Sequence, residues 1–209
     1  MNLFDYDLTE ILILGLALLY SIISHELGHG YVAYLMGDNT AKNRGRLSLN
    51  PLRHIDPIGL FSMLVFKFGW AKPVPINVFN FKKRRLGIFL VSIAGIFVNI
   101  LSAFIALLII AVFPDFVLSH HYFLFFLSLI VTYGISLACF NLLPIPPLDG
   151  SKIVLSFLPK RIQNFFFRFE RYGFFILMIL LFLNVLDKPI NILFDFIYTN
   201  LINLASIFA

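Results

Sequence analysis

The chain has 209 residues, of which 60% are hydrophobic and only 13% are charged. Soluble domains average about 45–50% apolar and about 25% charged residues, so this composition excludes an ordinary soluble globular protein. The formal net charge of +5 does not indicate nucleic-acid binding, because the basic residues occur in short runs between apolar segments and suit control of membrane topology. The single cysteine, Cys139, excludes an intrachain disulfide and a cysteine metal cluster.

Long apolar segments predict an all-α polytopic membrane protein with about five to six membrane helices, forming one domain over residues 1–209. In chain order the apolar segments are Leu8–Met36, Leu86–Phe113, Tyr122–Leu143, Tyr172–Leu186 and Pro189–Ala209. No basic region of a cleavable signal peptide precedes the first segment, so we expect it to remain and to span the membrane. The last segment carries several polar residues and either spans the membrane or lies in its interface.

The region between the first two long segments has a different character, rich in Gly, Pro, Asn and basic residues. Its apolar stretch, Ile58–Phe68, is too short for an ordinary span and predicts a re-entrant or interfacial element. The alternation of Val74, Ile76 and Val78 between prolines predicts a short strand or β-hairpin.

The distribution of basic residues predicts the orientation of the chain. Ten of the 16 basic residues lie within residues 37–85 and five within 152–171, whereas the first ten residues and residues 114–121 carry none. By the positive-inside tendency, the two basic regions face the cytoplasm, and the N-terminus and residues 114–121 face outward. The first and third apolar segments therefore both run inward, and the second runs outward.

The sequence HELGH at residues 25–29 predicts a metal site in the first apolar segment. On a helix, His25 and His29 share one face and can bind one zinc ion, while Glu26 can take a proton from the attacking water. The alternative is a chance motif with two buried histidines, but ionisable groups within a membrane segment are costly and favour function. Gly28 and Gly30 would let another backbone approach closely.

A catalytic zinc usually takes three protein ligands and keeps a fourth position for water, so one ligand must come from elsewhere. The candidates are acidic residues and histidines: Asp149, Asp56, Glu170, His54, His120 and His121. The last two are expected on the outer side, and Glu170 lies among basic residues that suit an ion pair. Asp149 follows the third segment, which runs inward like the first, so it should lie at the depth of the HELGH histidines, although Asp-Gly is also typical of a turn.

These two motifs together resemble the site-2 protease family of intramembrane zinc metalloproteases. HELGH is followed by NLLPIPPLDG at residues 141–150, and the stretches GRLSLNPLRHIDPIG and GWAKPVPIN also resemble the compact bacterial members. The stretch from Ser92 to Asn99 resembles the next helix of the family, although Ile96 stands where a proline is usual. The resemblance covers about Ser21 to Ser151, with no PDZ insertion.

The resemblance implies that one Zn²⁺ per chain is bound by His25, His29 and Asp149, and that Glu26 is the catalytic base. It implies proteolysis in or near the transmembrane helices of single-span proteins. The expected partners are these substrates and the lipid bilayer, with the oligomeric state left open and a homo-oligomer included. The expected location is the cytoplasmic (inner) membrane, with several spans, the site toward the cytoplasm and the N-terminus outside.

Residues outside the ligand set would handle the substrate. The resemblance suggests that Asn141 holds the substrate or stabilises the oxyanion, which needs a donor near the scissile carbonyl. For Asn99 we favour helix capping or an interhelical hydrogen bond. Residues 58–80 could offer a strand edge to an extended substrate.

The sequence also allows two other interpretations. One is a different class of membrane metalloprotease whose third zinc ligand is a glutamate, for which Glu170 is the later candidate. The other is a zinc transporter or a proteolytically inactive scaffold. The presence of Glu26 argues against the scaffold, because zinc binding alone does not need this residue.

Overall fold

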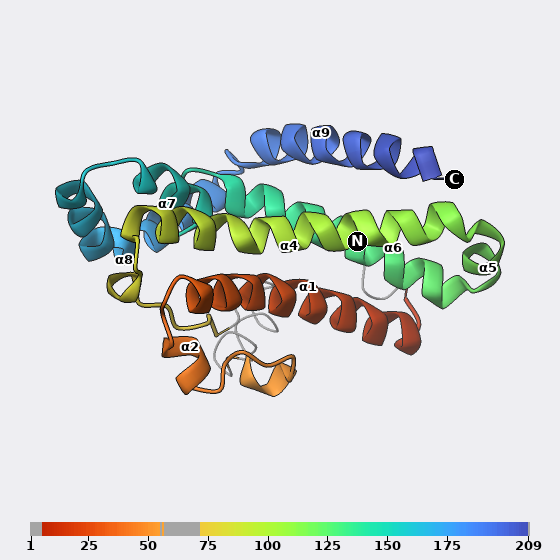
Figure 1. Cartoon of the computed structure of the whole chain (residues 1–209). Coiled ribbons are helices and arrows are strands. Elements are labelled where there is room, and N and C mark those ends of the chain that lie inside the picture. Colours follow the sequence, from red (N-terminus) through yellow and green to blue (C-terminus); the bar gives the residue numbers. More distant parts are fainter. Residues whose placement is uncertain (1–5, 55, 57–71, 209) are drawn as a thin grey trace.

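The computed structural model describes residues 6–54, 56 and 72–208 (Figure 1). The helices, in chain order, are α1 (Leu8–Leu35), α2 (Thr40–Asn43), η2 (Pro51–Arg53), η3 (Val78–Asn80), α4 (Arg84–Val112), α5 (Pro114–Ser119), α6 (His121–Leu142), α7 (Asp149–Ser156), α8 (Lys160–Phe182), α9 (Asp187–Ala205) and η4 (Ser206–Phe208). No strand is present within these described residues. The expected all-α class is therefore confirmed.

Three long helices form the centre of the molecule. α1, α4 and α6 lie lengthwise against one another, and α9 runs along α4 and α6 (Figure 1). Glycines let the backbones approach: a Cβ on Gly28 of α1 would lie 3.0 Å from the Ala94 carbonyl oxygen, and one on Gly134 of α6 would lie 2.8 Å from that of Asn99. Such close contact between apolar helices favours association within lipid.

The start of α1 is tied to the start of α6. Asp7 and Glu10 form a capping box at the N-terminus of α1, in which each side chain accepts a hydrogen bond from the backbone of the other. Glu10 Oε1 also lies 3.2 Å from His121 Nε2, and Tyr122 donates its hydroxyl to Asp7 Oδ2 over 3.0 Å. α1 and α6 therefore run parallel, as the alternation of inward and outward segments predicts, and their C-terminal halves meet at the opposite end.

Four helices of the described chain are long and apolar enough to cross a membrane: α1, α4, α6 and the stretch Asp187–Phe208. The expected span at Tyr172–Leu186 differs, because its apolar part covers only Tyr172–Phe182, at the end of α8. The final segment, expected either to span the membrane or to lie in its interface, is part of the stretch Asp187–Phe208, which is long enough to cross a membrane. A polytopic protein is thus supported, but the expected count of five to six spans is not reached in the described residues.

The region expected to form a strand or hairpin has another structure where it is described. Residues 72–77 are neither helical nor extended in a ladder, and η3 begins at Val78, so the strand expected over Val74–Val78 is absent. Two of the residues in this stretch are prolines, which cannot donate to a ladder, and the N–H groups of Val74 and Asn77 bond to carboxylates instead. The expected re-entrant stretch, Ile58–Phe68, lies outside the described residues.

Candidate metal centre

Two histidines of HELGH share one face of α1. His25 and His29 lie four residues apart, which places their rings on the same side of the helix. Both side chains are buried, and their Nε2 atoms lie 2.9 Å apart. His29 Nδ1 lies 2.6 Å from the carbonyl oxygen of Val91, so this face of α1 is turned toward α4. The helix thus brings two ring nitrogens to one point inside the bundle.

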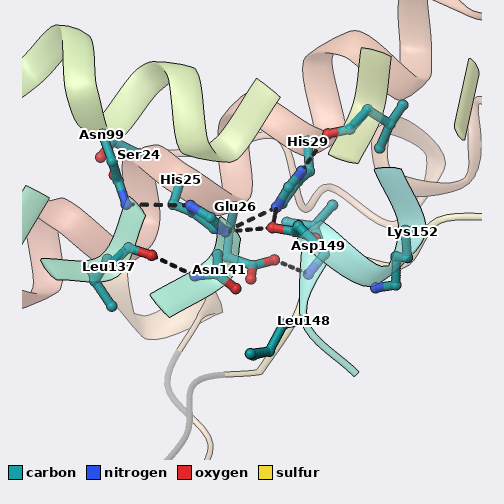
Figure 2. Close-up of polar contacts among 12 residues, drawn as sticks. Ser24, His25, Glu26, His29, Asn99, Leu137, Asn141, Leu148, Asp149 and Lys152 are labelled. Carbon is teal, nitrogen blue, oxygen red and sulfur yellow. Dashed lines mark hydrogen bonds and ion pairs between the residues drawn. The ribbon is translucent and has the colours of Figure 1, made fainter. Parts of the chain in front are cut away.

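Asp149 reaches the same point from the turn that follows α6. The prolines between Leu142 and Asp149 cannot continue the helix, so α6 ends and α7 begins at Asp149. Gly150 allows this turn to fold tightly, because a Cβ there would collide with the carbonyl oxygen of Leu142. Asp149 Oδ2 lies 3.2 Å from His25 Nε2 and 3.0 Å from His29 Nε2 (Figure 2).

The carboxylate of Glu26 lies beside this group without belonging to it. Figure 2 shows Glu26 next to the side chains of His25 and Asp149, and its Oε2 accepts a hydrogen bond from the main-chain N–H of Val74 over 2.7 Å. The side chain is half-buried. A carboxylate in this place is free of the metal position and can serve as a base, provided that the contact with Val74 is exchanged for one with water.

The segment 72–75 is bonded to a buried arginine that follows α2. Arg46 Nη2 donates to the carbonyl oxygens of Lys72, over 2.7 Å, and Pro73, over 3.3 Å. Val74 is buried above Gly30, where an added Cβ would lie 3.0 Å from Val74 Cγ1. The atoms that meet Gly30 are side-chain atoms of Leu47, Val74 and Ala41, so the close backbone approach expected at the two glycines is observed at Gly28 and not at Gly30.

A second anchor of the same region is the buried side chain of Asp38. Its Oδ2 accepts from the main-chain N–H of Asn77 over 2.7 Å, and its Oδ1 accepts from Asn80 Nδ2 over 2.8 Å and from the N–H of Thr40 over 3.1 Å. Burial raises the pKa of the Asp38 carboxyl, but the hydrogen bonds from Asn77, Thr40 and Asn80 together hold it below its ordinary value. Asp38 therefore joins the end of α1 to the segment that covers Glu26.

Helix α4 forms the wall behind the histidines. Gly95 is required there, because a Cβ would lie only 2.6 Å from His25 Cε1 and 2.6 Å from His29 Nε2. One turn further along, Asn99 Nδ2 lies 3.3 Å from His25 Nδ1, and the asparagine is fully buried. The expected interhelical bond of Asn99 is confirmed, and its partner is one of the two motif histidines.

This donor set fits a zinc ion. Two imidazole nitrogens and a carboxylate oxygen are common catalytic zinc ligands, and donors about 2.0–2.2 Å from a tetrahedral ion lie about 3.3–3.5 Å from one another. The three observed separations, 2.9, 3.0 and 3.2 Å, are slightly shorter. Asp149 Oδ2 is buried and, apart from the ring nitrogens of His25 and His29, has no hydrogen-bond partner among the described residues, so a cation shared by the three side chains would satisfy it.

The other candidate ligands lie elsewhere. Glu170 was expected to pair with Arg168 or Arg171, and its Oε1 instead lies 3.3 Å from Lys152 Nζ. His54 Nε2 bonds to the carbonyl oxygen of Ser48 over 2.7 Å. Among the described residues, the one group of histidines and acids close enough to share a metal ion is His25, His29 and Asp149, and Asp56 is outside it.

The last two candidates, His120 and His121, are separated from this group by the length of α6. They lie at its start, where His121 contacts Glu10, whereas His25, His29 and Asp149 meet near its end. The expected separation along the bundle is therefore observed.

Asn141, expected to contact substrate, lies on the last turn of α6. Its Nδ2 donates to the carbonyl oxygen of Leu137, four residues earlier, over 3.0 Å, and the side chain is half-buried (Figure 2). One of the two N–H groups of the Asn141 amide is therefore used within its own helix. A role with substrate would require the amide to exchange that bond.

Three contacts of the site have no sequence signal or only a weak one. The carbonyl of Val91 and the N–H of Val74 are main-chain groups, which every residue carries. Asn99 did have a signal, since a polar amide inside a long apolar helix is costly and favours a specific partner. The sequence did not indicate that this partner is His25.

Comparisons with known proteins point to one family. The model of Peptidase family M50 matches residues 117–184, which include Asp149 but not HELGH. "Putative zinc metalloprotease YwhC" of Bacillus subtilis is 41% identical over 186 residues, covering 84% of this chain and 82% of the relative. "Putative zinc metalloprotease Rip2" of Mycolicibacterium smegmatis is 30% identical over 176 residues, covering 81% and 66%. No solved structure matches the chain significantly.

Proposed function

Because the chain belongs to peptidase family M50 and is a zinc metalloprotease, we propose that it hydrolyses peptide bonds in or near the transmembrane helices of single-span membrane proteins. The observation that carries this proposal is the convergence of His25, His29 and Asp149 at one buried point between apolar helices. A site on a surface domain would need no such burial. One zinc ion per chain is proposed at this point.

The proposed chemistry divides between the metal and the chain. Bound zinc would supply a Lewis acid that makes a water molecule acidic enough to attack at neutral pH. Glu26 would take the proton from the attacking water and deliver it to the leaving amine. His25, His29 and Asp149 would hold the ion, and Gly95 leaves the room that their rings need.

The segment 72–75 would have to yield before Glu26 can act. The N–H of Val74 occupies Glu26 Oε2, and the same carboxylate must contact the attacking water. Exchange of this one hydrogen bond for water costs little, since the net contribution of such a bond is about 0.5–1.5 kcal/mol, or somewhat more with a charged acceptor. Substrate entry next to Val74 would accomplish this exchange.

The expected strand edge has few free groups in the described part of its segment. Pro73 and Pro75 carry no N–H, the N–H groups of Val74 and Asn77 bond to carboxylates, and the Pro73 carbonyl accepts from Arg46. Within residues 72–77, pairing with a substrate strand would therefore require these bonds to break. We propose instead that this segment positions Glu26, and that Asn141 is the group that contacts substrate.

The proposed placement follows the basic residues. Residues 1–209 form a single core domain in the cytoplasmic membrane, with the N-terminus outside and the ligand group near the cytoplasmic side. The parallel directions of α1 and α6 support this placement, because they bring the second half of α1 and the turn after α6 to the same depth. The partners are single-span proteins and the surrounding lipid.

The test is cleavage in a bilayer. The purified protein is reconstituted into liposomes with single-span model substrates, and the cleaved bonds are mapped by mass spectrometry, with Glu26→Gln as the matched control. We expect cleavage within or next to the span, lost in Glu26→Gln and lost reversibly on zinc chelation. Cleavage confined to soluble polypeptides, or turnover that survives Glu26→Gln, would contradict the proposal.

A further inference from the structure

Asn99 occupies the place where the three central helices meet. Its side chain is fully buried on α4. α6 lies directly behind it, because a Cβ on Gly134 would be 2.8 Å from the Asn99 carbonyl oxygen. On the other side, its amide nitrogen is 3.3 Å from His25 Nδ1 of α1 (Figure 2). A polar side chain so enclosed needs a partner for each of its polar atoms.

In this orientation of the Asn99 amide, only its nitrogen has a hydrogen-bond partner. Nδ2 faces His25 Nδ1, while Oδ1 is buried and, within the described residues, has no hydrogen-bond partner. An N–H group of Asn99 can donate to His25 Nδ1 only if that ring nitrogen carries no proton. The proton of a neutral imidazole would then sit on Nε2, which points at Asp149 Oδ2, 3.2 Å away.

That tautomer is incompatible with metal binding through Nε2, because a ligand nitrogen must present its lone pair. The second histidine of the site is arranged in the opposite way. His29 Nδ1 faces an oxygen, the carbonyl of Val91, over 2.6 Å, so its proton belongs on Nδ1 and its Nε2 is free for the metal.

A half-turn of the Asn99 amide gives His25 the same arrangement. The oxygen and nitrogen of a carboxamide are nearly identical in size, so the exchange fits the same space. It brings Oδ1 to His25 Nδ1, where it accepts the ring N–H, and the NH₂ group takes the place that Oδ1 held. The gain therefore lies in the tautomer of His25.

We propose that Asn99 is a positioning residue of the metal centre: its side-chain oxygen accepts a hydrogen bond from His25 Nδ1–H and holds His25 in the tautomer whose Nε2 lone pair faces the metal. This role rests on the proposed zinc site. Two different helix α4 acceptors, the Val91 carbonyl and the Asn99 amide, then orient the two histidines of α1.

The zinc affinities of two Asn99 variants distinguish hydrogen bonding to His25 from a role in which Asn99 only fills space between the helices. Asn99→Leu keeps the volume but removes the acceptor, and Asn99→Asp keeps the acceptor but removes the N–H₂ group. Loss of such a supporting partner typically weakens metal binding about 10- to 100-fold. We expect that loss in Asn99→Leu, and affinity at or above the wild-type value in Asn99→Asp, measured by competition with a chelator.

Ser102→Ala is the matched control. Ser102 lies on α4 three residues later and bonds to the Tyr20 hydroxyl of α1 over 3.2 Å, so its loss also removes a polar contact between the two helices. We expect unchanged zinc affinity in this variant. Equal affinity of Asn99→Leu and wild type would overturn the role of Asn99, as would an Asn99→Asp variant as weak as Asn99→Leu.

A measurement on the unaltered protein keeps the proposal testable if Asn99→Leu fails to fold. The ¹⁵N spectrum of histidine-labelled, metal-free protein at a pH where the ring is neutral reports which ring nitrogen of His25 carries the proton. A proton on Nδ1 is expected, and one on Nε2 would overturn the proposal. If the wild-type protein bound no zinc, both the proposed metal site and the role of Asn99 would be wrong. If wild type and Asn99→Leu bound zinc equally well, only the role of Asn99 would be wrong.

Discussion

A histidine faces a carboxylate at both ends of the α1–α6 pair, and the two places differ in what surrounds them. At one end His121 Nε2 lies 3.2 Å from Glu10 Oε1, and at the other His25 Nε2 lies 3.2 Å from Asp149 Oδ2. The His121 side chain is 70% exposed, whereas that of His25 is 9% exposed. A second histidine, His29, joins only the buried pair.

The comparison shows that distance alone does not indicate a metal site. An exposed pair is screened by water and contributes little to stability. The buried set cannot be solvated, so its polar atoms require partners from the protein or a cation. Gly95, Val91 and Asn99 provide the close wall that the buried set needs. His121 instead lies against the rings of Tyr122 and Phe125 and is mostly in solvent.

The largest expected effect is on turnover, when the glutamate at each end is replaced by glutamine. Glu26→Gln should lower turnover about 10²- to 10⁴-fold, the usual contribution of a general base, and should keep zinc because Glu26 is not in the ligand group. Glu10→Gln should leave turnover unchanged, since glutamine also completes a capping box. Initial rates of substrate cleavage together with zinc content measure both, and an active Glu26→Gln would contradict the assignment of the base.

The next effect concerns the wall of the buried set. Gly95→Ala places a methyl group 2.6 Å from atoms of both His25 and His29, so the rings must move. We expect zinc affinity to fall about 10- to 100-fold, the range seen when the support of metal ligands is disturbed. Gly15→Ala on α1 is the control, because its Cβ would meet nothing within 4 Å. Equal zinc affinity of the two variants would show that the wall is not needed.

A smaller effect is expected at Asp38, which anchors the segment covering Glu26. Asp38→Asn should reduce stability by about 1.5–3 kcal/mol, the range for hydrogen bonds to a charged group. The folded pKa of Asp38 is below its ordinary value, so the ionised carboxylate stabilises the fold above the unfolded pKa of about 3.9, and this contribution disappears as pH falls through the folded pKa.

The difference between wild type and Asp38→Asn should therefore be largest near neutral pH and shrink in acid. Thermal unfolding of both proteins without metal, between neutral pH and about pH 3, tests this without interference from zinc loss. A difference that grows toward acid pH would have the wrong sign and would contradict the role given to Asp38.

The smallest effect is expected when His121, at the exposed end of the α1–α6 pair, is replaced. His121→Ala removes a contact whose histidine is mostly in solvent, so stability should change by less than about 0.5 kcal/mol. Zinc content and turnover should stay at wild-type levels. A loss of zinc in His121→Ala would remove the distinction between the two ends.

Much of the buried site was predictable from the sequence because its constraints are local or topological. HELGH places two histidines on one helical face by spacing alone. The charge bias gives the first and third segments the same direction, and this predicts that Asp149 lies at the depth of His25. The structure brings these residues together.

The parts that were not predictable depend on contacts between distant main-chain groups. The bond from Val74 to Glu26 joins residues 48 apart, and its donor is a backbone N–H. The expected strand over Val74–Val78 failed because the alternation of apolar residues does not reveal that carboxylates take up the N–H groups. The predicted number of five to six membrane spans is also higher than the four found in the described residues, because the apolar part of α8 is too short to cross a membrane.

We propose that the buried carboxylate of Asp149, and not another acid, completes a zinc site with His25 and His29. Zinc content of the purified wild type, Asp149→Asn and Glu170→Gln tests it directly, because Glu170 is the alternative acid and pairs with Lys152 in the structure. We expect one zinc per chain in wild type and Glu170→Gln, and little or none in Asp149→Asn. Full zinc in Asp149→Asn together with loss in Glu170→Gln would contradict it.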